Sequence, residues 1–199
     1  MSVNLDITEI CNLALDYLDE APLASIDDNS AVARWFRRNF WPMAWSLMRR
    51  HPWNFAMART LLPASATPPA FGWTFAYDLP VDCLRVMALT VDGTENARSI
   101  PHKVEGSQIL TDEPAPRPVR YVRHVENTGQ FDQQFTDVLA MALAQKAAHF
   151  ITGKASYAES LGQKTQAAFP RRRRSMPWKA RRMTSKTISG SRLVPDGRL

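Results

Sequence analysis

Histidines, paired carboxylates and cysteines are the residues of this chain that could do chemistry. The four histidines show neither HxH nor HExxH spacing, which would bring two imidazoles to one metal ion; they are His51, His102, His124 and His149. No GxxxxGK phosphate loop and no GxSxG nucleophile elbow occurs either. We therefore expect structural or surface roles for the histidines, and we predict no metal site and no cofactor.

The carboxylates and thiols fit a structural interpretation equally well. Asp19–Glu20 and Asp27–Asp28 are adjacent pairs that could act as acid and base, but helix ends and polar loops account for them. Cys11 and Cys83 have neither metal-ligand spacing nor a disulfide framework, which favours a reducing compartment. We interpret Cys83 as a small apolar side chain at the start of a strand, and we predict no catalytic residue.

Positive charge is concentrated at one end of the chain. The 199 residues carry a net charge of +6, from 25 Lys and Arg against 19 Asp and Glu. Residues 170–199 hold ten of the bases and one of the acids, so this segment carries +9 and the preceding 169 residues carry −3. A segment rich in Pro, Ser and Arg cannot bury enough apolar surface to fold alone, so we expect an extended basic arm that a partner would order.

Apolar residues recur at helical spacing in two segments before residue 50. The first runs from Ile7 to Leu18, and Asp6 with Glu9 three residues later has the spacing of a capping box. The second, from Val32 to Leu47, contains Pro42, which should kink the helix or divide it into two. Its opposite face carries Arg34, Arg37, Arg38, Arg49 and Arg50. A solvated charged face is the plainer explanation of these arginines, and a contact surface is the alternative.

The stretch from Phe71 to Val91 predicts two strands joined by a turn. Aromatic and aliphatic residues alternate with small or polar ones from Trp73 to Leu79, and Pro80 then interrupts the pattern. We expect an antiparallel hairpin whose aromatic face is covered by helices, because a lone hairpin is marginal in water. Further strand patterns at 98–104, 108–111 and 119–125 extend it to a small antiparallel sheet of about three to five strands.

Two more helices are expected after the strands. The first, Phe131 to Thr152, is apolar around more than half of its circumference and is followed by Gly153, a typical C-terminal stop. Its apolar surface must be covered, either by the other helices of the chain or by a neighbouring subunit. In the second case the oligomer interface would contain Leu139, Leu143, Ala147 and Phe150. Ser156 to Phe169 forms the final helix and completes a helical hairpin.

These patterns predict an α+β fold that is mostly α. A bundle of about four helices, from residues 5–50 and 131–169, would carry an inserted β region at 53–125. Residues 1–169 would form one body, and residues 170–199 the basic C-terminal arm. The longest apolar run, Val138–Ala144, is far shorter than the roughly 20 residues of a membrane span, so we expect a soluble, unsecreted protein with no membrane partner.

Several blocks of the chain, in this order, resemble the head-to-tail adaptor (connector) proteins of tailed bacteriophages, including the tail tubular protein A type. The blocks are ICNLALDYLDEAPLASIDD for the first helix and loop, HPWNFAMARTLL after the second helix, FGWTFAYDLPVDCLRV for the strand-turn-strand, and the final helical pair. The resemblance covers about Leu5 to Phe169 and leaves the arm unmatched.

The resemblance implies a structural virion protein without catalytic activity. Such adaptors form a ring of about twelve copies, a dodecamer, beneath the portal protein, where they extend the DNA channel and seat the downstream tail protein. It also implies that the protein is located in the virion neck and, during assembly, in the host cytoplasm. In this family the C-terminal segment commonly grips the portal.

The role of the arm has three alternatives. It could dock on an acidic portal surface through eight residues, which are Arg171, Arg172, Arg173, Arg174, Trp178, Lys179, Arg181 and Arg182. It could instead contact channel DNA non-specifically, since Lys and Arg neutralise phosphates without reading sequence, or it could be a solvated extension. For the whole protein, a nucleic-acid-binding function using this arm is the alternative to the adaptor. No residue pattern supports an enzyme.

Overall fold

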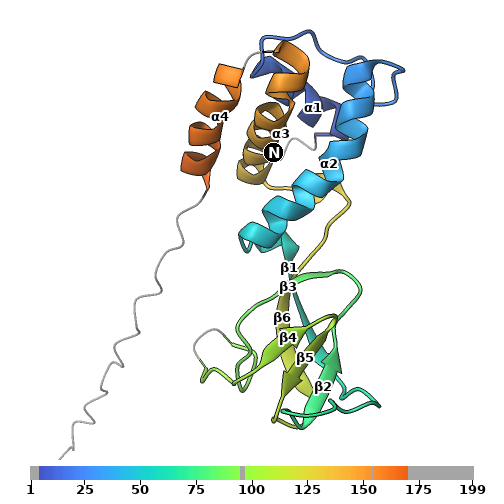
Figure 1. Cartoon of the computed structure of the whole chain (residues 1–199), viewed down its shortest axis with the longest axis vertical. Helices are drawn as coiled ribbons and strands as arrows, with labels where there is room; N and C mark the ends of the chain where they lie inside the picture. The colour runs from blue at the N-terminus through green and yellow to red at the C-terminus, as the bar shows by residue number, and fades with distance from the viewer. Residues whose placement is uncertain (1–4, 95–96, 154, 170–199) are drawn as a thin grey trace, which may run out of the picture. The chain divides into compact units, whose positions relative to one another are not determined.

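Four helices come from the two ends of the described chain, and six short strands come from between them (Figure 1). The computed structural model describes residues 5–94, 97–153 and 155–169. The tertiary contacts divide the chain into two units, Met1–Phe169 and Pro170–Leu199, and every described residue belongs to the first. The fold is α+β and mostly α, as the sequence predicted.

The first two helices begin where their sequences predict. Helix α1, Ile7–Asp16, starts with a complete capping box: Glu9 N–H donates to the Asp6 carboxylate at 2.8 Å, and Asp6 N–H donates to the Glu9 carboxylate at 2.7 Å. Helix α2, Ala31–Arg50, is capped by Ser30 and continues through Pro42 as one helix. The alternative of two successive helices is therefore wrong.

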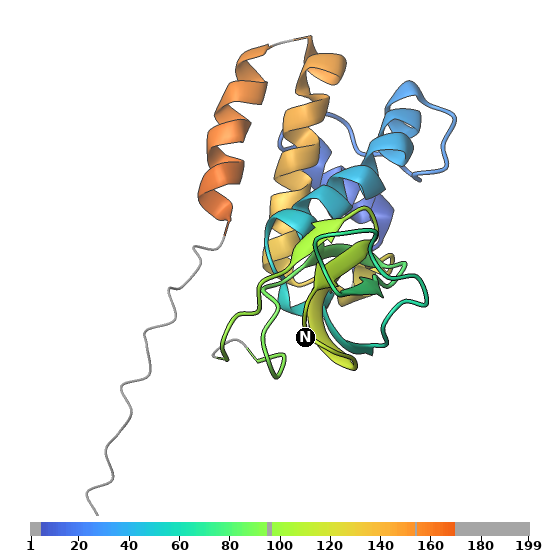
Figure 2. The same cartoon turned by 60° about the horizontal axis from the view of Figure 1, so that its bottom comes forward.

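Helix α3, Gln133–Thr152, is the central helix of the bundle and packs against α1, α2 and α4. The Asp132 carboxylate caps its start, and Gly153 ends it in the left-handed conformation with φ of 69°. Helix α4, Ala155–Ala168, runs alongside α3 in Figures 1 and 2. A Cβ at Gly162 would lie 2.8 Å from Nε2 of Gln145, so this glycine lets α4 approach α3 closely.

The strands form two antiparallel sheets of three strands each within the described residues. The first sheet has the order β1-β6-β3, from Met57–Leu62, Arg117–Arg123 and Cys83–Val86. The second has the order β2-β5-β4, from Phe75–Asp78, Gln108–Thr111 and Lys103–Glu105. Two single-turn helices, Asn54–Ala56 and Thr128–Gln130, lead into β1 and out of β6.

The predicted hairpin between β2 and β3 does not form, because the two strands belong to different sheets. The turn between β2 and β3 is hydrogen-bonded to segments beside both sheets. Leu79 N–H donates to Ser107 C=O at 2.8 Å beside the second sheet, while His124 N–H donates to Asp82 C=O at 2.9 Å beside the first. The Tyr121 hydroxyl adds a hydrogen bond to the Asp82 carboxylate at 3.1 Å. The segment LPVD is thus a corner at which the chain changes sheets.

The body contains two hydrophobic cores. The larger one lies among the four helices and extends to Val122 and Val125 at the end of the first sheet. The smaller one lies between the two sheets and consists of Leu62, Tyr77, Leu89, Ile100, Ile109 and Val119. The expectation that helices cover the aromatic face of β2 is therefore wrong, because Tyr77 is fully buried against the other sheet.

Tyr77 is the largest side chain of the smaller core. Its hydroxyl donates to Glu113 C=O at 2.7 Å, and burial raises its pKa.

We expect Tyr77→Ala to lower the free energy of unfolding by about 3–5 kcal/mol, because it leaves a cavity and an unpaired carbonyl. Phe71→Ala is the matched control, since Phe71 is 88% exposed and should change stability by less than about 0.5 kcal/mol. Urea denaturation measures both, and equal midpoints for the two variants would contradict the assigned core.

Candidate interaction surfaces

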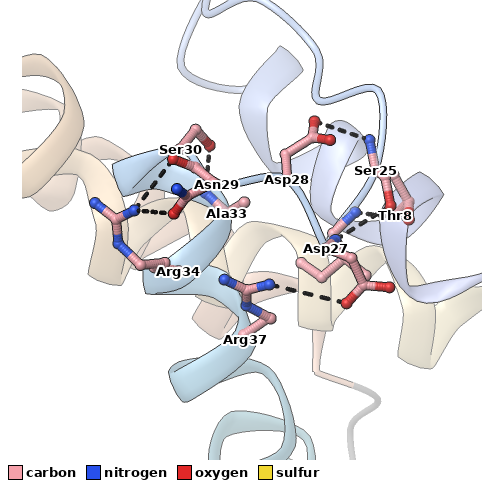
Figure 3. Close-up of polar contacts among 10 residues, drawn as sticks. Thr8, Ser25, Asp27, Asp28, Asn29, Ser30, Ala33, Arg34 and Arg37 are labelled. Carbon is pink, nitrogen blue, oxygen red and sulfur yellow. Dashed lines mark hydrogen bonds and ion pairs between the residues drawn. The ribbon is translucent and has the colours of Figure 1, made fainter.

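The structure gives the histidines and paired carboxylates no common site. His51 packs edge-on against Trp53, His124 packs against Trp45, and His102 Nδ1 lies 2.8 Å from Ile100 C=O. Asp28 accepts a hydrogen bond from Ser25 N–H at 3.1 Å and shapes the loop before α2 (Figure 3). Within residues 5–94, 97–153 and 155–169, no three His, Cys, Asp or Glu side chains lie close enough to hold a metal ion.

Both cysteines are free thiols, in different surroundings. Cys11 is buried in the helical core, where desolvation and then the nearby Asp6 carboxylate raise its pKa to about 12. Cys83 is partly buried at the start of β3, and burial also raises its pKa, with Asp82 contributing. A thiol that resists ionisation is a poor nucleophile, so neither microenvironment favours thiolate chemistry.

Three of the four predicted interface residues lie inside the chain's own core. Leu139, Leu143 and Ala147 are each 0% exposed and belong to the cluster that α3 forms with the other helices. The prediction that they contact a second copy is therefore wrong, since α1, α2 and α4 already cover them. The error arose because a helix that is apolar on most sides has the same sequence pattern whether its cover is internal or external.

Phe150 differs from these three residues. It lies in the last turn of α3 and is 51% exposed. Its inner side stacks on Trp35 of α2, with ring centroids 6.2 Å apart and planes 16° from parallel. The outer half of the ring is open, so Phe150 remains a predicted contact residue.

Three arginines of α2 line the same hollow as this exposed ring. Ala31, Arg34, Arg37, Arg38 and Phe150 line a hollow of about 460 Å³. Positions 37 and 38 come three and four residues after position 34, so both of their side chains neighbour that of Arg34 on the helix surface. We call these three arginines with Phe150 the arginine hollow. It joins cationic groups to an aromatic surface, a combination that is enriched in the binding sites of protein interfaces.

The charges of the arginine hollow are only partly compensated. One guanidinium NH of Arg34 donates to Asn29 C=O at 3.1 Å and to its Oδ1 at 2.7 Å, and neither acceptor carries a charge (Figure 3). Arg37 lies 3.9 Å from Asp27, whose side chain is 85% exposed, which makes a loose surface pair. The hollow therefore carries three cations against one loosely paired carboxylate, an excess of positive charge that favours an anionic partner.

The other two arginines of α2 make contacts with other elements of the same chain instead. Arg49 donates to Leu84 C=O in β3, and the Arg50 guanidinium lies 4.5 Å from the Phe169 ring centroid after α4. The five arginines that the sequence presented as one face thus have two roles, separated by their position along α2.

The β region has an apolar surface that sequence analysis did not single out. A hollow of about 330 Å³ lies beside the loop before β2, and Phe71, Trp73, Lys103 and Glu105 are among the residues that line it. Val81 at the corner between the sheets is also fully exposed. The signal available in the sequence was the run of apolar residues in the proline-rich segment that precedes β2.

The predicted portal-binding residues lie outside the part of the chain that the structure describes. They are Arg171, Arg172, Arg173, Arg174, Trp178, Lys179, Arg181 and Arg182. Their role stays a prediction.

The burial of α3 leads to a test of the corrected interface. We expect Leu143→Ala to lower the free energy of unfolding by about 2–5 kcal/mol at every protein concentration, because this leucine packs against residues of its own chain. Phe150→Ala should lower the free energy of unfolding much less, since half of that ring is already in water. Urea titrations at low and high protein concentration measure both variants. A destabilisation by Leu143→Ala that appears only at high concentration would restore the interface prediction.

The two thiols should differ in reactivity. We use a disulfide-exchange reagent at pH 8, well below the raised pKa of Cys11. In the native protein we expect Cys83 to react before Cys11, but more slowly than an exposed thiol of ordinary pKa. Cys11 should react only when denaturant opens the helical core. Peptide mass spectrometry after timed quenching distinguishes the two sites, and Cys83→Ser should remove the first phase. Fast native labelling at Cys11 would be inconsistent with its burial.

None of the helices among the described residues has the length and apolar content needed to cross a membrane. No family model matches the chain, and no curated protein matches it either.

Proposed function

We propose that this protein is a structural virion component, a head-to-tail adaptor subunit whose ring joins the portal of a tailed bacteriophage to its tail and extends the DNA channel. The observation that carries the proposal is the ordered series of sequence blocks that resemble that family between Leu5 and Phe169. The mostly helical body with an inserted β region is the kind of subunit that this resemblance implies.

The resembling blocks occupy the joints of the fold, which supports a structural role. In HPWNFAMARTLL, Trp53 is 3% exposed, packs edge-on against Phe135 at 5.1 Å and donates its indole N–H to Leu47 C=O at 3.2 Å. In FGWTFAYDLPVDCLRV, the segment LPVD forms the corner between the sheets. Residues at these positions fix the packing of the helices and strands against one another. A structural subunit requires such a rigid arrangement.

The surfaces of the body also suit a subunit with several neighbours. The arginine hollow lies on the helices, and the apolar surface around Phe71 lies on the β region. A ring subunit between a portal and a tail needs separate surfaces for sister copies and for other components. The proposed partners are about eleven further copies, the portal protein and the downstream tail protein, with non-specific contact to channel DNA. The proposed locations are the virion neck and, before assembly, the host cytoplasm.

Residues 170–199 are proposed to bind the portal. Their net charge of +9 fits an acidic surface, and Trp178 supplies an aromatic anchor among the cations.

Truncation of the arm tests this assignment. We expect a chain ending at Phe169 to keep the unfolding midpoint of the full chain, because both hydrophobic cores are built from earlier residues, and to lose attachment to purified portal particles. A pull-down with electron microscopy of the portal fraction measures attachment. A full-length variant with Gln at Arg171, Arg172, Arg173 and Arg174 controls for chain length and should also bind weakly.

The possible results separate the arm from the function. Unchanged portal attachment by the truncated chain would refute the role of the arm alone. A full-length chain that never forms a collar on portals, but binds double-stranded DNA with an affinity that falls steeply with salt, would refute the adaptor and favour the nucleic-acid-binding alternative.

A further inference from the structure

Two helix ends of the bundle, the C-terminus of α1 and the N-terminus of α2, carry charges of the same sign as the helix dipole at that end. Helix α2 has no acid in its first turn, and Arg34 lies at the end of that turn, where the helix dipole is positive; Arg37 and Arg38 follow one turn later. Helix α1 has no base in its last turn, and Asp16 and Glu20 lie at its C-terminus, where the dipole is negative. Asp16 and Arg34 therefore each lie at a helix end whose dipole has the sign of the side chain, an unfavourable local interaction. Local conflicts of this kind are expected where a protein binds something.

The end of α1 also carries an exposed aromatic ring. Tyr17, the residue after α1, is 39% exposed, and Asp16 and Glu20 on either side of it are exposed as well. The chain here is tightly wound, since Leu18 N–H and Glu20 N–H both donate to Leu15 C=O, at 2.8 and 3.2 Å. We call Asp16, Tyr17 and Glu20 the acidic knob. Its composition is the counterpart of the arginine hollow: anions beside an aromatic ring instead of cations beside one.

The knob and the hollow lie at opposite ends of α1. The loop after α1 runs back along that helix, because Leu23 exchanges two hydrogen bonds with the Asn12 side chain and Ile26 N–H donates to Thr8 Oγ1 at 3.2 Å. Helix α2 therefore starts beside the beginning of α1, about one helix length, roughly 15 Å, from the knob. One subunit could then engage two different neighbours at once.

The geometry points to a head-to-tail contact in which the acidic knob of one copy docks in the arginine hollow of the next. We propose this contact as the subunit interface of the ring, so it rests on the proposed adaptor function. Asp16 and Glu20 of one copy pair with Arg34 and Arg38 of its neighbour, and Tyr17 packs on the open half of Phe150. The contact brings the negative end of α1 to the positive end of α2, which relieves both conflicts. Because the acidic knob and the arginine hollow are different surfaces, the contact is heterologous. Its repetition builds a ring when the rotation from each copy to the next adds up to a full turn.

Charge reversal of each face tests the pairing. The first variant, Arg34→Glu with Arg38→Glu, gives a chain with two acidic faces and leaves the Arg37–Asp27 pair untouched. The second, Asp16→Lys with Glu20→Lys, gives a chain with two basic faces. A third, Arg59→Glu with Lys164→Glu, makes the same change in net charge as the first at exposed positions on β1 and α4 and is the matched control. All four substituted positions of the first two variants are exposed, and circular dichroism checks that each variant folds.

Sedimentation velocity and native mass spectrometry, at protein concentrations up to the solubility limit, measure self-association. We expect the unaltered chain and the control to associate, and each reversed variant alone to bind itself at least about ten-fold more weakly. Mixing the two reversed variants should restore assembly with strict 1:1 composition, because every acidic face then meets a basic one. Added salt should weaken all of these assemblies.

Other outcomes overturn the inference. These are a monomeric unaltered chain at every concentration, reversed variants that assemble as the unaltered chain does, and a mixture that does not recover. If the first variant assembles normally but loses binding to a double-stranded oligonucleotide, the hollow serves nucleic acid instead. Portal attachment is measured separately, so a chain that forms collars on portals with both reversed variants retains the adaptor function and loses only this interface.

Discussion

The body depends on covering helix α3, which is apolar around most of its circumference. Helices α1, α2 and α4 pack against it, and the aromatic rings of Trp53, Phe55, Phe131 and Phe135 close its first turns through edge-on and tilted contacts. Since each ring touches the next, the end of α2, the start of β1 and the start of α3 are held by one cluster. Exposing α3 would release all of these elements together, so its burial within one chain is the condition for the rest of the fold.

Internal covering of α3 limits how copies of the chain can associate. The leucines and alanines of α3 that could pack against a helix of a second copy are already buried within the chain. The apolar surface of α3 that is left for another molecule therefore lies at the rim of the bundle. At that rim, Phe150 is stacked on Trp35 from inside and open outside, among arginines whose charges are partly uncompensated. Association there would combine electrostatic guidance with a small apolar centre.

The β region has a hydrophobic core of its own, which its two sheets share. The corner at LPVD makes this possible by sending β2 and β3 to different sheets, and it is fixed from both sides by backbone hydrogen bonds. The same corner leaves Val81 fully exposed, and the loop before β2 exposes Phe71. The polar contacts that order the region are therefore internal, whereas its exposed apolar residues are available to other proteins.

The sequence by itself determined the helices and their approximate ends, because capping residues, a terminal glycine and helical periodicity act within a few residues of each other. Asp6 with Glu9 and Gly153 did what their local chemistry predicts. Only the tertiary structure decided which strands pair and what covers α3. Strand pairing joins residues such as Tyr77 and Ile109 across 32 positions of sequence, and alternation reveals which side of a strand is apolar but not its neighbour. In the same way, helical periodicity shows that Leu143 must be buried, whereas the identity of the covering chain depends on contacts between distant segments.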